Sequence, residues 1–260
     1  MGPWNNLLGK APSTPVEASA NSLSHPTDPS VDMMQQLTGR LSYQFRQAKS
    51  NEESYVVPRR SHFIWIGSVI PVRYVANVAR FASLNPSYEV NLWVDHLTPA
   101  IAGVHIRQVD LANLRNAAEY AHERNCGARA DILRYEIIST HGGVYLDVDC
   151  IAMKPFDDLF LSSFVTYALH PWNNVTNAMF GFPAKSFFLD FLIRCLCENF
   201  TRGLADVVER TGPTFFTTCF VQYGDANIRM IPQSIALSYD PSVRGPVPGG
   251  YIIHTCDKNW

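Results

Sequence analysis

The chain has 260 residues, of which 47% are hydrophobic and 17% are charged. This length and apolar content suit one domain with a sizeable core. The 21 basic residues nearly balance the 23 acidic ones, and the formal net charge is −2. A nucleic-acid-binding protein needs a basic stripe or patch, so no nucleic-acid partner is expected. No apolar run is long enough for a membrane-spanning helix, so no integral membrane segment is expected.

The first part of the chain has the composition of a disordered leader, which we place at residues 1–30. Ser, Thr and Pro dominate residues 11–30, and such a segment buries too little apolar surface to fold alone. The opening residues lack the basic start and apolar core of a secretory signal peptide. Apolar residues spaced three and four apart then predict a helical N-terminal extension within residues 31–57. A single globular domain is expected over residues 58–260.

Predicted strands alternate with predicted helices along this domain. Short, β-prone apolar runs predict strands at 62–66, 89–94, 104–109, 144–146, 164–169, 177–182 and 251–254. Helical spacing of apolar residues predicts helices at 71–84, 111–124, 127–140 and 186–200. The alternation favours an α/β fold with a parallel or mixed, Rossmann-like sheet flanked by helices.

The six cysteines are expected to be free thiols, most of them buried. None of them has C-x-x-C spacing, and no cysteine–histidine cluster has the spacing of a zinc finger. Unpaired cysteines of this kind are typical of proteins in a reducing compartment.

Two carboxylates, Asp147 and Asp149, follow the predicted strand 144–146. Open α/β sheets bind ligands at the carboxyl ends of their strands. Two Asp side chains one residue apart at that place can reach the same divalent cation. Their oxygens suit Mg²⁺ or Mn²⁺, which also bridge phosphate oxygens. Because acidic residues are common at strand ends, this D-x-D motif alone is weak evidence for a metal site.

The helix before that strand carries Asp131 and Arg134, which are three residues apart and share one helical face. A solvent-exposed ion pair is the ordinary explanation of such spacing. The turn at Gly142-Gly143, however, leads from this helix directly into the strand that ends at the D-x-D motif. The Asp131–Arg134 face can therefore approach the two carboxylates, where it can hydrogen-bond sugar hydroxyls.

The run D-I-L-R at 131–134, followed by G-G-V-Y-L-D-V-D at 142–149, resembles the nucleotide-sugar site of the D-x-D glycosyltransferases. This family includes the initiating yeast-type α-mannosyltransferases and the glucosylating domains of the large clostridial toxins. Further segments are similar to family elements, namely His62–Gly67, Asn85–Asp95, Thr211-Gly212-Pro213 and His254 to Trp260. The resemblance covers most of residues 58–182 and shorter fragments beyond. It implies a GT-A-type fold and retention of the anomeric configuration.

The resemblance also implies how the donor is bound. Trp65 would stack on the base, which is expected to be uracil, and Tyr145 would line the nucleotide pocket. Asp131 and Arg134 would bind the donor sugar. The donor is thus expected to be a UDP-sugar, although guanine stays open as the base, and glucose, N-acetylglucosamine, galactose and mannose all stay open as the sugar.

A metal ion and the C-terminal residues complete the implied site. Asp149 would ligate Mn²⁺ or Mg²⁺ directly, and Asp147 would contact the ribose or sugar and the water around the metal. Asn259 or Asp257 would complete the metal shell, and Trp260 would close over the diphosphate. Cleavage of the donor leaves negative charge on that diphosphate, which a divalent cation stabilises without proton transfer.

These features predict a metal-dependent, retaining glycosyltransferase that moves a hexose from a nucleotide sugar to an acceptor protein or glycan. The chain lacks the length of the toxin catalytic domains, so their small-GTPase targets are not implied. No membrane anchor like that of the eukaryotic mannosyltransferases is expected either. A soluble bacterial enzyme is expected, in the bacterial cytoplasm or, if exported as an effector, in the host cytosol.

Three other functions are compatible with parts of the sequence. The enzyme could modify a glycan or a lipid instead of a protein. A phosphatase of the haloacid-dehalogenase type also carries D-x-D after a strand, but its fifth position is usually Thr or Val and here is Ile151. A catalytically inactive sugar- or nucleotide-binding module is the third alternative. The presence of Asp147, Asp149 and Arg134 together argues against such decay.

Overall fold

The computed structural model describes residues 55–168, 174–225, 227–237 and 249–257. In these ranges the strands are β1 (Arg60–Trp65), β2 (Glu89–Val94), β3 (Val104–Gln108), β4 (Gly143–Leu146), β5 (Cys150–Ala152), β6 (Phe164–Ala168), β7 (Asn174–Phe182), β8 (Arg229–Pro232) and β9 (Ile252–His254). The helices are α2 (Val72–Leu84), α3 (Ala117–His122), α4 (Cys126–His141), the 3₁₀ turn η1 (Asp158–Phe160), α5 (Phe187–Thr201), α6 (Val207–Arg210), α7 (Pro213–Tyr223) and α8 (Gln233–Ala236).

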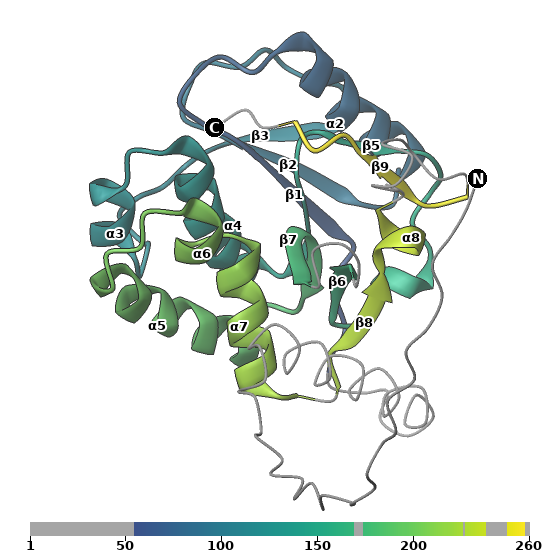
Figure 1. Ribbon diagram of the computed structural model, residues 1–260. Coiled ribbons are helices and arrows are strands. Elements are labelled where there is room, and N and C mark those ends of the chain that lie inside the picture. Colours follow the sequence, from purple (N-terminus) through teal and green to yellow (C-terminus); the bar gives the residue numbers. More distant parts are fainter. Residues whose placement is uncertain (1–54, 169–173, 226, 238–248, 258–260) are drawn as a thin grey trace, which may run out of the picture.

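The described strands form one large mixed sheet and one small sheet (Figure 1). The large sheet has seven strands in the order β3-β2-β1-β4-β7-β6-β8. Strands β3, β2, β1 and β4 are parallel, whereas β7 is antiparallel to both β4 and β6. The small sheet pairs β5 with β9 in antiparallel register. It brings residues near position 254 next to the D-x-D motif.

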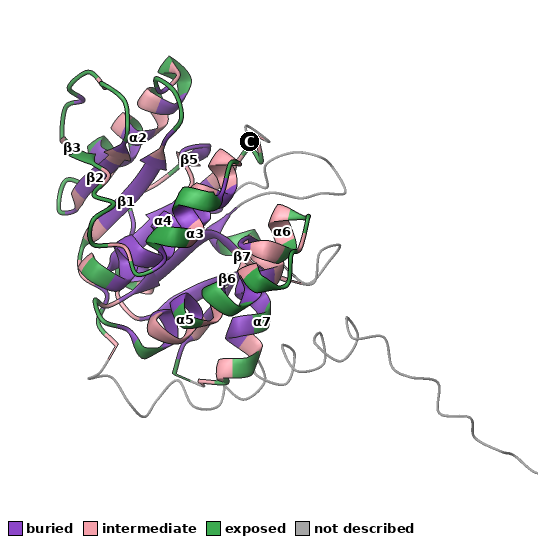
Figure 2. Ribbon diagram, turned by 90° about the vertical axis from the view of Figure 1, so that its left-hand side faces the viewer, coloured by how far each residue is buried: buried purple, intermediate pink, exposed green. Residues whose placement is uncertain are grey.

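The central strands divide two hydrophobic cores between them, because successive side chains point to opposite faces of a sheet. In β1, Phe63 packs into one core and Ile64 into the other. In β4, Val144 and Leu146 share the core of Phe63, while Tyr145 shares that of Ile64. Helix α2 and the β5–β9 pair cover the first face, and α4, α5 and α7 cover the second (Figures 1 and 2).

Helix α4 positions the polar residues of the chain's most informative segment. The Asn125 side chain caps its first turn by accepting a hydrogen bond from the Ala128 N–H at 3.0 Å. The helix ends at Gly142 and Gly143, which have φ angles of 64° and 113°. A Cβ on Gly143 would lie 2.5 Å from the Arg60 carbonyl oxygen. Glycine is therefore required for the turn that lays β4 directly beside β1.

The observed elements agree with most of the predicted ones, and the mixed α/β sheet flanked by helices is confirmed. The predicted helix 111–124 is shorter than expected, because only residues 117–122 are helical. Asp110 accepts hydrogen bonds from the Ala112 N–H and the Asn113 side chain, and these bonds fold the preceding residues into a turn. Helices α6, α7 and α8 and strands β5 and β8 were not predicted from the sequence.

The predicted leader at 1–30 and most of the predicted helical extension at 31–57 lie outside the described residues. Residues 55–57, at the end of that extension, are extended rather than helical. The Val57 N–H donates to the Leu161 carbonyl at 2.9 Å, and the Ser163 N–H donates to the Tyr55 carbonyl at 2.9 Å. Among the described residues, no helix combines the length and apolar character that crossing a membrane requires.

Candidate active site

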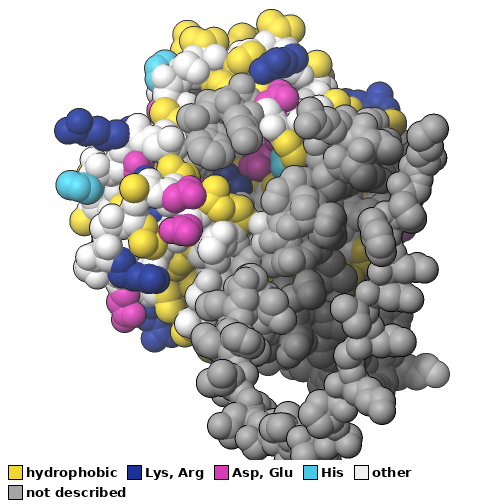
Figure 3. Space-filling view, in the orientation of Figure 1, with side chains coloured by type: hydrophobic (Ala, Val, Ile, Leu, Met, Phe, Trp, Pro, Cys, Tyr) yellow, Lys and Arg dark blue, Asp and Glu magenta, His cyan; other side chains and the backbone are white. Residues whose placement is uncertain are grey.

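A cavity of about 380 Å³ opens at the carboxyl ends of β1 and β4. Acidic, basic and histidine side chains meet near the centre of this face of the molecule (Figure 3). The described residues predicted for the site all line the cavity, namely Trp65, Asp131, Arg134, Tyr145, Asp147, Asp149 and Asp257. The other two predicted residues, Asn259 and Trp260, lie outside the described residues.

Arg134 joins the helix, the D-x-D strand and β7 at the bottom of this cavity. Its side chain is only 7% exposed, with Nη2 3.1 Å from Asp131 Oδ1 and Nη1 3.1 Å from Asp147 Oδ1. Nη1 also donates to the Asn177 carbonyl at 2.9 Å, and the guanidinium lies 4.5 Å from the centre of the Tyr145 ring. Burial alone would lower the Arg134 pKa, but the Asp147 charge raises it, and the net shift is upward. Arg134 and Asp131 therefore form a buried ion pair and not the solvent-exposed one that is the ordinary explanation of their spacing.

Asp131 is held in one orientation by three side chains. Its Oδ1 accepts a hydrogen bond from Asn177 Nδ2 at 2.8 Å in addition to its contact with Arg134. Its Oδ2 accepts from the Thr211 hydroxyl at 2.8 Å. Burial raises the Asp131 pKa to about 6, although Arg134 opposes the shift. Neither Asn177 nor Thr211 was predicted as a site residue; Thr211 was noted only as part of a short family resemblance.

Asp147 and Asp149 lie in different electrostatic surroundings. Asp147 Oδ1 accepts a hydrogen bond from the Tyr145 hydroxyl at 2.7 Å. Burial is the main cause that raises the Asp147 pKa, and the neighbouring Asp149 charge adds to it. For Asp149, burial works in the same direction, but its hydrogen bond with His254 outweighs it and lowers the pKa. Asp149 is therefore the carboxylate that stays ionised most readily.

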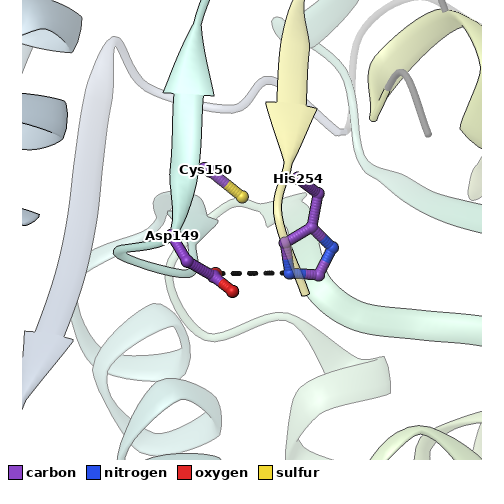
Figure 4. A group of neighbouring side chains, drawn as sticks. All are labelled: Asp149, Cys150 and His254. Carbon is purple, nitrogen blue, oxygen red and sulfur yellow. Dashed lines mark ion pairs between the residues drawn. The ribbon is translucent and has the colours of Figure 1, made fainter. Parts of the chain in front are cut away.

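His254 also lines the cavity and was not predicted as a site residue. It comes from β9, where it pairs with Cys150 of β5, and its Nε2 lies 3.3 Å from Asp149 Oδ1 (Figure 4). The same nitrogen lies 3.9 Å from Asp147 Oδ2. Burial lowers the His254 pKa, but the bond to Asp149 raises it more, and the net shift is well upward. The sequence offered one indication of its role, because His254 is the first residue of the segment His254 to Trp260 that resembles a family element.

The side chains at the cavity carry more negative than positive charge. The carboxylates of Asp131, Asp147 and Asp149 face the guanidinium of Arg134 and the imidazole of His254. Carboxylate oxygens and imidazole nitrogen are ligands that divalent cations accept. The D-x-D carboxylates and His254 could therefore hold a divalent cation, which would offset the excess charge.

The aromatic wall of the cavity is connected to the residues that follow β9. Trp65 packs against Tyr74 of α2, with their ring centres 5.1 Å apart. The Tyr74 hydroxyl donates to Asp257 Oδ2 at 2.8 Å, and the Asp257 N–H donates to Asp149 Oδ2 at 2.8 Å. Asp257, predicted as one possible metal ligand, thus directs its carboxylate to α2 and its backbone to the D-x-D motif. Trp65 Nε1 is buried and has no hydrogen-bond partner among the described residues.

Comparisons with known proteins agree with this geometry. Residues 71–165 match the family described as the glycosyltransferase sugar-binding region containing the DXD motif. The chain is 26% identical over 171 residues to subversion of eukaryotic traffic protein A of Legionella pneumophila, covering 60% of this chain and 25% of that protein. It is 26% identical over 170 residues to inositol phosphoceramide mannosyltransferase 3 of Schizosaccharomyces pombe, covering 64% of this chain and 46% of the relative.

A solved structure, the UDP-bound glycosyltransferase domain from the YGT toxin, has the same fold. It superposes with a TM-score of 0.56 at 12% identity, covering 68% of this chain and 80% of that domain. The predicted resemblance to the D-x-D glycosyltransferases and the predicted GT-A-type fold are thereby confirmed. The predicted enzyme class, a glycosyltransferase, is that of the mannosyltransferase relative and of the toxin domain. The chain spans less than half the length of either curated relative.

Proposed function

We propose that this chain is a metal-dependent glycosyltransferase that moves a hexose from a nucleotide sugar, expected to be a UDP-sugar, to an acceptor. The observation that carries the proposal is the crowding of Asp131, Asp147 and Asp149 around one cavity, where Arg134 and His254 are their cationic partners among the described residues. A buried excess of negative charge is costly unless a cation joins it. The UDP in the toxin neighbour supports a uridine nucleotide as the donor's leaving group.

The D-x-D carboxylates and His254 would hold Mn²⁺ or Mg²⁺, whose charge would stabilise the departing diphosphate. Arg134 and the Tyr145 hydroxyl both contact Asp147 Oδ1, so the carboxylate is oriented before the donor arrives. Such preorganised groups act without a cost of rearrangement during the reaction. Trp65, which lines the same cavity, would stack on the base.

We further propose that Asp131 orients the donor sugar and that the anomeric configuration is retained. Both Asp131 oxygens accept hydrogen bonds from protein groups, so this carboxylate is not poised to attack the sugar carbon. Its position on the cavity wall next to Arg134 suits a contact with sugar hydroxyls. In the retaining route proposed here, the acceptor enters on the face that the diphosphate leaves, and a diphosphate oxygen takes the acceptor's proton.

The proposed acceptor is a protein, and the proposed setting is a bacterial effector that acts in a host cell. The Legionella relative, named for the subversion of eukaryotic traffic, supports this choice. The yeast relative, named for the mannosylation of inositol phosphoceramide, supports the alternative of a lipid acceptor. Transfer assays with a host-cell lysate and with extracted lipids would separate the two, because radiolabelled sugar would enter only one fraction.

Donor hydrolysis tests the core of the proposal without knowledge of the acceptor. The purified chain is incubated with UDP-glucose, UDP-N-acetylglucosamine, UDP-galactose or GDP-mannose, with Mn²⁺, with Mg²⁺ or with a chelator. We expect one donor to release nucleoside diphosphate and free sugar only in the presence of a metal, and NMR of the first-formed sugar to show the retained anomer.

Two variants and two other products make this test decisive. Asp149→Asn should abolish the release, whereas Asp158→Asn should not, because the Asp158 side chain is 92% exposed outside the cavity. Release of inorganic phosphate would instead indicate the phosphatase alternative. Metal-dependent binding of UDP without any turnover, with or without acceptor, would indicate an inactive binding module.

A further inference from the structure

A cysteine, Cys150, follows the D-x-D motif directly and lies behind the cavity wall. Its sulfur, a carboxylate oxygen of Asp149 and a ring nitrogen of His254 all lie within 4.8 Å of one another (Figure 4). The cavity is lined by Asp149 and His254 but not by Cys150, whose side chain is buried at 1% exposure. The three residues come from the paired strands β5 and β9 and the turn before β5. The group therefore has one open side, which faces the cavity.

The addition of a thiolate to the carboxylate and the imidazole does not favour the cations expected for donor binding. Mg²⁺ and Mn²⁺ prefer oxygen ligands, whereas a thiolate is a soft ligand that selects zinc and similar ions. Zinc in proteins is bound by Cys sulfur, His nitrogen and Asp oxygen, and a site with three protein ligands leaves one position open. A Cys–His–Asp group beside an open cavity matches that description.

The distances suit zinc after a small contraction. Zinc–nitrogen and zinc–oxygen bonds of about 2.0–2.2 Å place the two atoms roughly 3.3 Å apart in a tetrahedral site. His254 Nε2 and Asp149 Oδ1 are 3.3 Å apart. A zinc–sulfur bond of about 2.3 Å requires roughly 3.6 Å from the sulfur to each of those atoms. The Cys150 sulfur lies at most 4.8 Å from each of these two atoms. It therefore has to move by little more than about 1 Å, which rotation of its side chain supplies.

We propose that Asp149, Cys150 and His254 form a binding site for a thiophilic divalent cation, with zinc as its representative, and that zinc bound there inhibits sugar transfer. The inhibition rests on the proposed function, which assigns Asp149 to the catalytic cation. Three protein bonds to zinc form, the Cys150 thiol and the His254 ring each release a proton to solvent, and the fourth position faces the cavity. Because Asp149 and His254 are shared with the catalytic cation, zinc excludes Mn²⁺ from the D-x-D motif.

Cobalt provides a direct readout of the sulfur ligand. Co²⁺ bound to a thiolate has an intense near-ultraviolet charge-transfer band that is absent when only oxygen and nitrogen bind. The full chain, freed of metal by a chelator, is titrated with Co²⁺ and then with Zn²⁺. We expect the band to appear with Co²⁺ and to disappear when Zn²⁺ displaces it. Added Zn²⁺ should also lower Mn²⁺-dependent donor hydrolysis at constant Mn²⁺.

Two serine variants assign the sulfur. Cys150→Ser should remove the band and weaken zinc binding by about tenfold or more, because the soft ligand is lost. It should retain Mn²⁺-dependent binding of UDP, which reports that the fold and the donor site are intact. Cys256 lines the cavity and its sulfur lies 3.5 Å from His254 Nδ1, but it is not part of the group of Asp149, Cys150 and His254. Cys256→Ser is therefore the matched control and should keep the band.

The outcomes separate this inference from the proposed function. Absence of the band in the wild-type chain, or its loss in Cys256→Ser with retention in Cys150→Ser, would overturn the inference. If the band behaves as expected but no donor is hydrolysed and no UDP is bound with Mn²⁺, the metal site stands and the proposed function fails. If Zn²⁺ binds through Cys150 and hydrolysis is unaffected, the inhibitory part of the inference is wrong.

Discussion

Both ends of the central strands carry charged side chains, but the balance between positive and negative charges differs between the two ends. At the amino ends of β1 and β2, Arg60 contacts Glu89 at 2.9 Å; the side chain of Arg107, from the fourth position of β3, also reaches Glu89 at 3.3 Å, and all three are partly exposed to solvent. At the carboxyl ends, the charged groups are mostly buried around the cavity, and carboxylates outnumber cationic groups.

The buried histidines at the two ends differ in the same way. His62, at the amino end, accepts a hydrogen bond from Trp93 Nε1 at 2.9 Å, and its Nε2 lies 3.0 Å from the Gly142 carbonyl oxygen. Burial lowers its pKa to about 3, so it is neutral. His254 lies near two carboxylates, and its pKa is raised well above the ordinary value because its hydrogen bond with Asp149 outweighs the effect of burial. Polar groups that are fully paired with each other stabilise the sheet. A buried group of side chains with an excess of negative charge next to a cavity indicates a ligand site.

The largest effect is expected from Asp149→Ala, which removes the most readily ionised carboxylate at the cavity. A metal ion stabilises phosphate charge by several kcal/mol, so Mn²⁺-dependent affinity for UDP should fall by roughly a hundredfold or more. Isothermal titration calorimetry with and without Mn²⁺ measures this. If the metal-dependent part of the binding survives, the carboxyl end has no special electrostatic role and the comparison fails.

Arg134→Met tests whether the carboxyl-end charges depend on one cation. Removal of one partner from a buried ionic group costs about 3–5 kcal/mol, so the free energy of unfolding should fall by about that amount. Urea denaturation measures it. The control is Arg194→Met, whose side chain is 73% exposed and pairs with Asp190 on the same helix, and which should cost only about 0.3–0.5 kcal/mol. Equal losses in the two variants would contradict the assignment.

Trp65→Ala is expected to have a smaller effect, confined to the nucleotide. Aromatic stacking on a base contributes about 1–3 kcal/mol, which corresponds to a loss of roughly ten- to a hundredfold in affinity for UDP. Trp65→Phe should keep much of the affinity. Calorimetric titration with UDP in the presence of Mn²⁺ checks both. A folded Trp65→Ala chain that binds UDP as wild type does would make Trp65 a core residue only.

The smallest effect at neutral pH is expected from His62→Gln, whose amide can still donate to the Gly142 carbonyl oxygen. The folded-state pKa of His62 is about 3, below the ordinary value of 6.5, so the unfolded chain binds the proton first as pH falls. The stability that neutral His62 contributes is therefore full above pH 6.5 and is lost as pH falls towards 3. Wild type should lose stability relative to the variant by up to about 1.4 kcal/mol per pH unit in that window. Parallel stability curves would disprove this role.

The sequence predicted the local parts of the site better than the parts that meet across the chain. The spacing of Asp131 and Arg134 predicted one shared helical face, and the glycine turn predicted that this face approaches the D-x-D motif. In the structure Arg134 contacts both Asp131 and Asp147. Each of these inferences concerns neighbours within about 20 residues, where helical and strand periodicity apply directly.

The missed features depend on contacts between distant segments. His254 reaches Asp149 through β9, whose three residues are too few to reveal a partner strand by their pattern. Thr211, directly after α6, and Asn177 of β7 both contact Asp131, and in the sequence neither can be told from an ordinary polar residue. The predicted helix at 111–124 was too long because periodicity does not register the Asp110 turn.

The pairing of β5 with β9 also sets the order in which the site is assembled during synthesis. Asp257 donates its N–H to Asp149 across a separation of 108 residues. At about 5–20 residues per second, a ribosome needs roughly 5–20 s to proceed from one to the other. During that interval the strands that carry the D-x-D motif are already available, while His254 has not yet been made. A nascent chain can therefore form the central strands first, and the cavity acquires its histidine only when synthesis has passed β9.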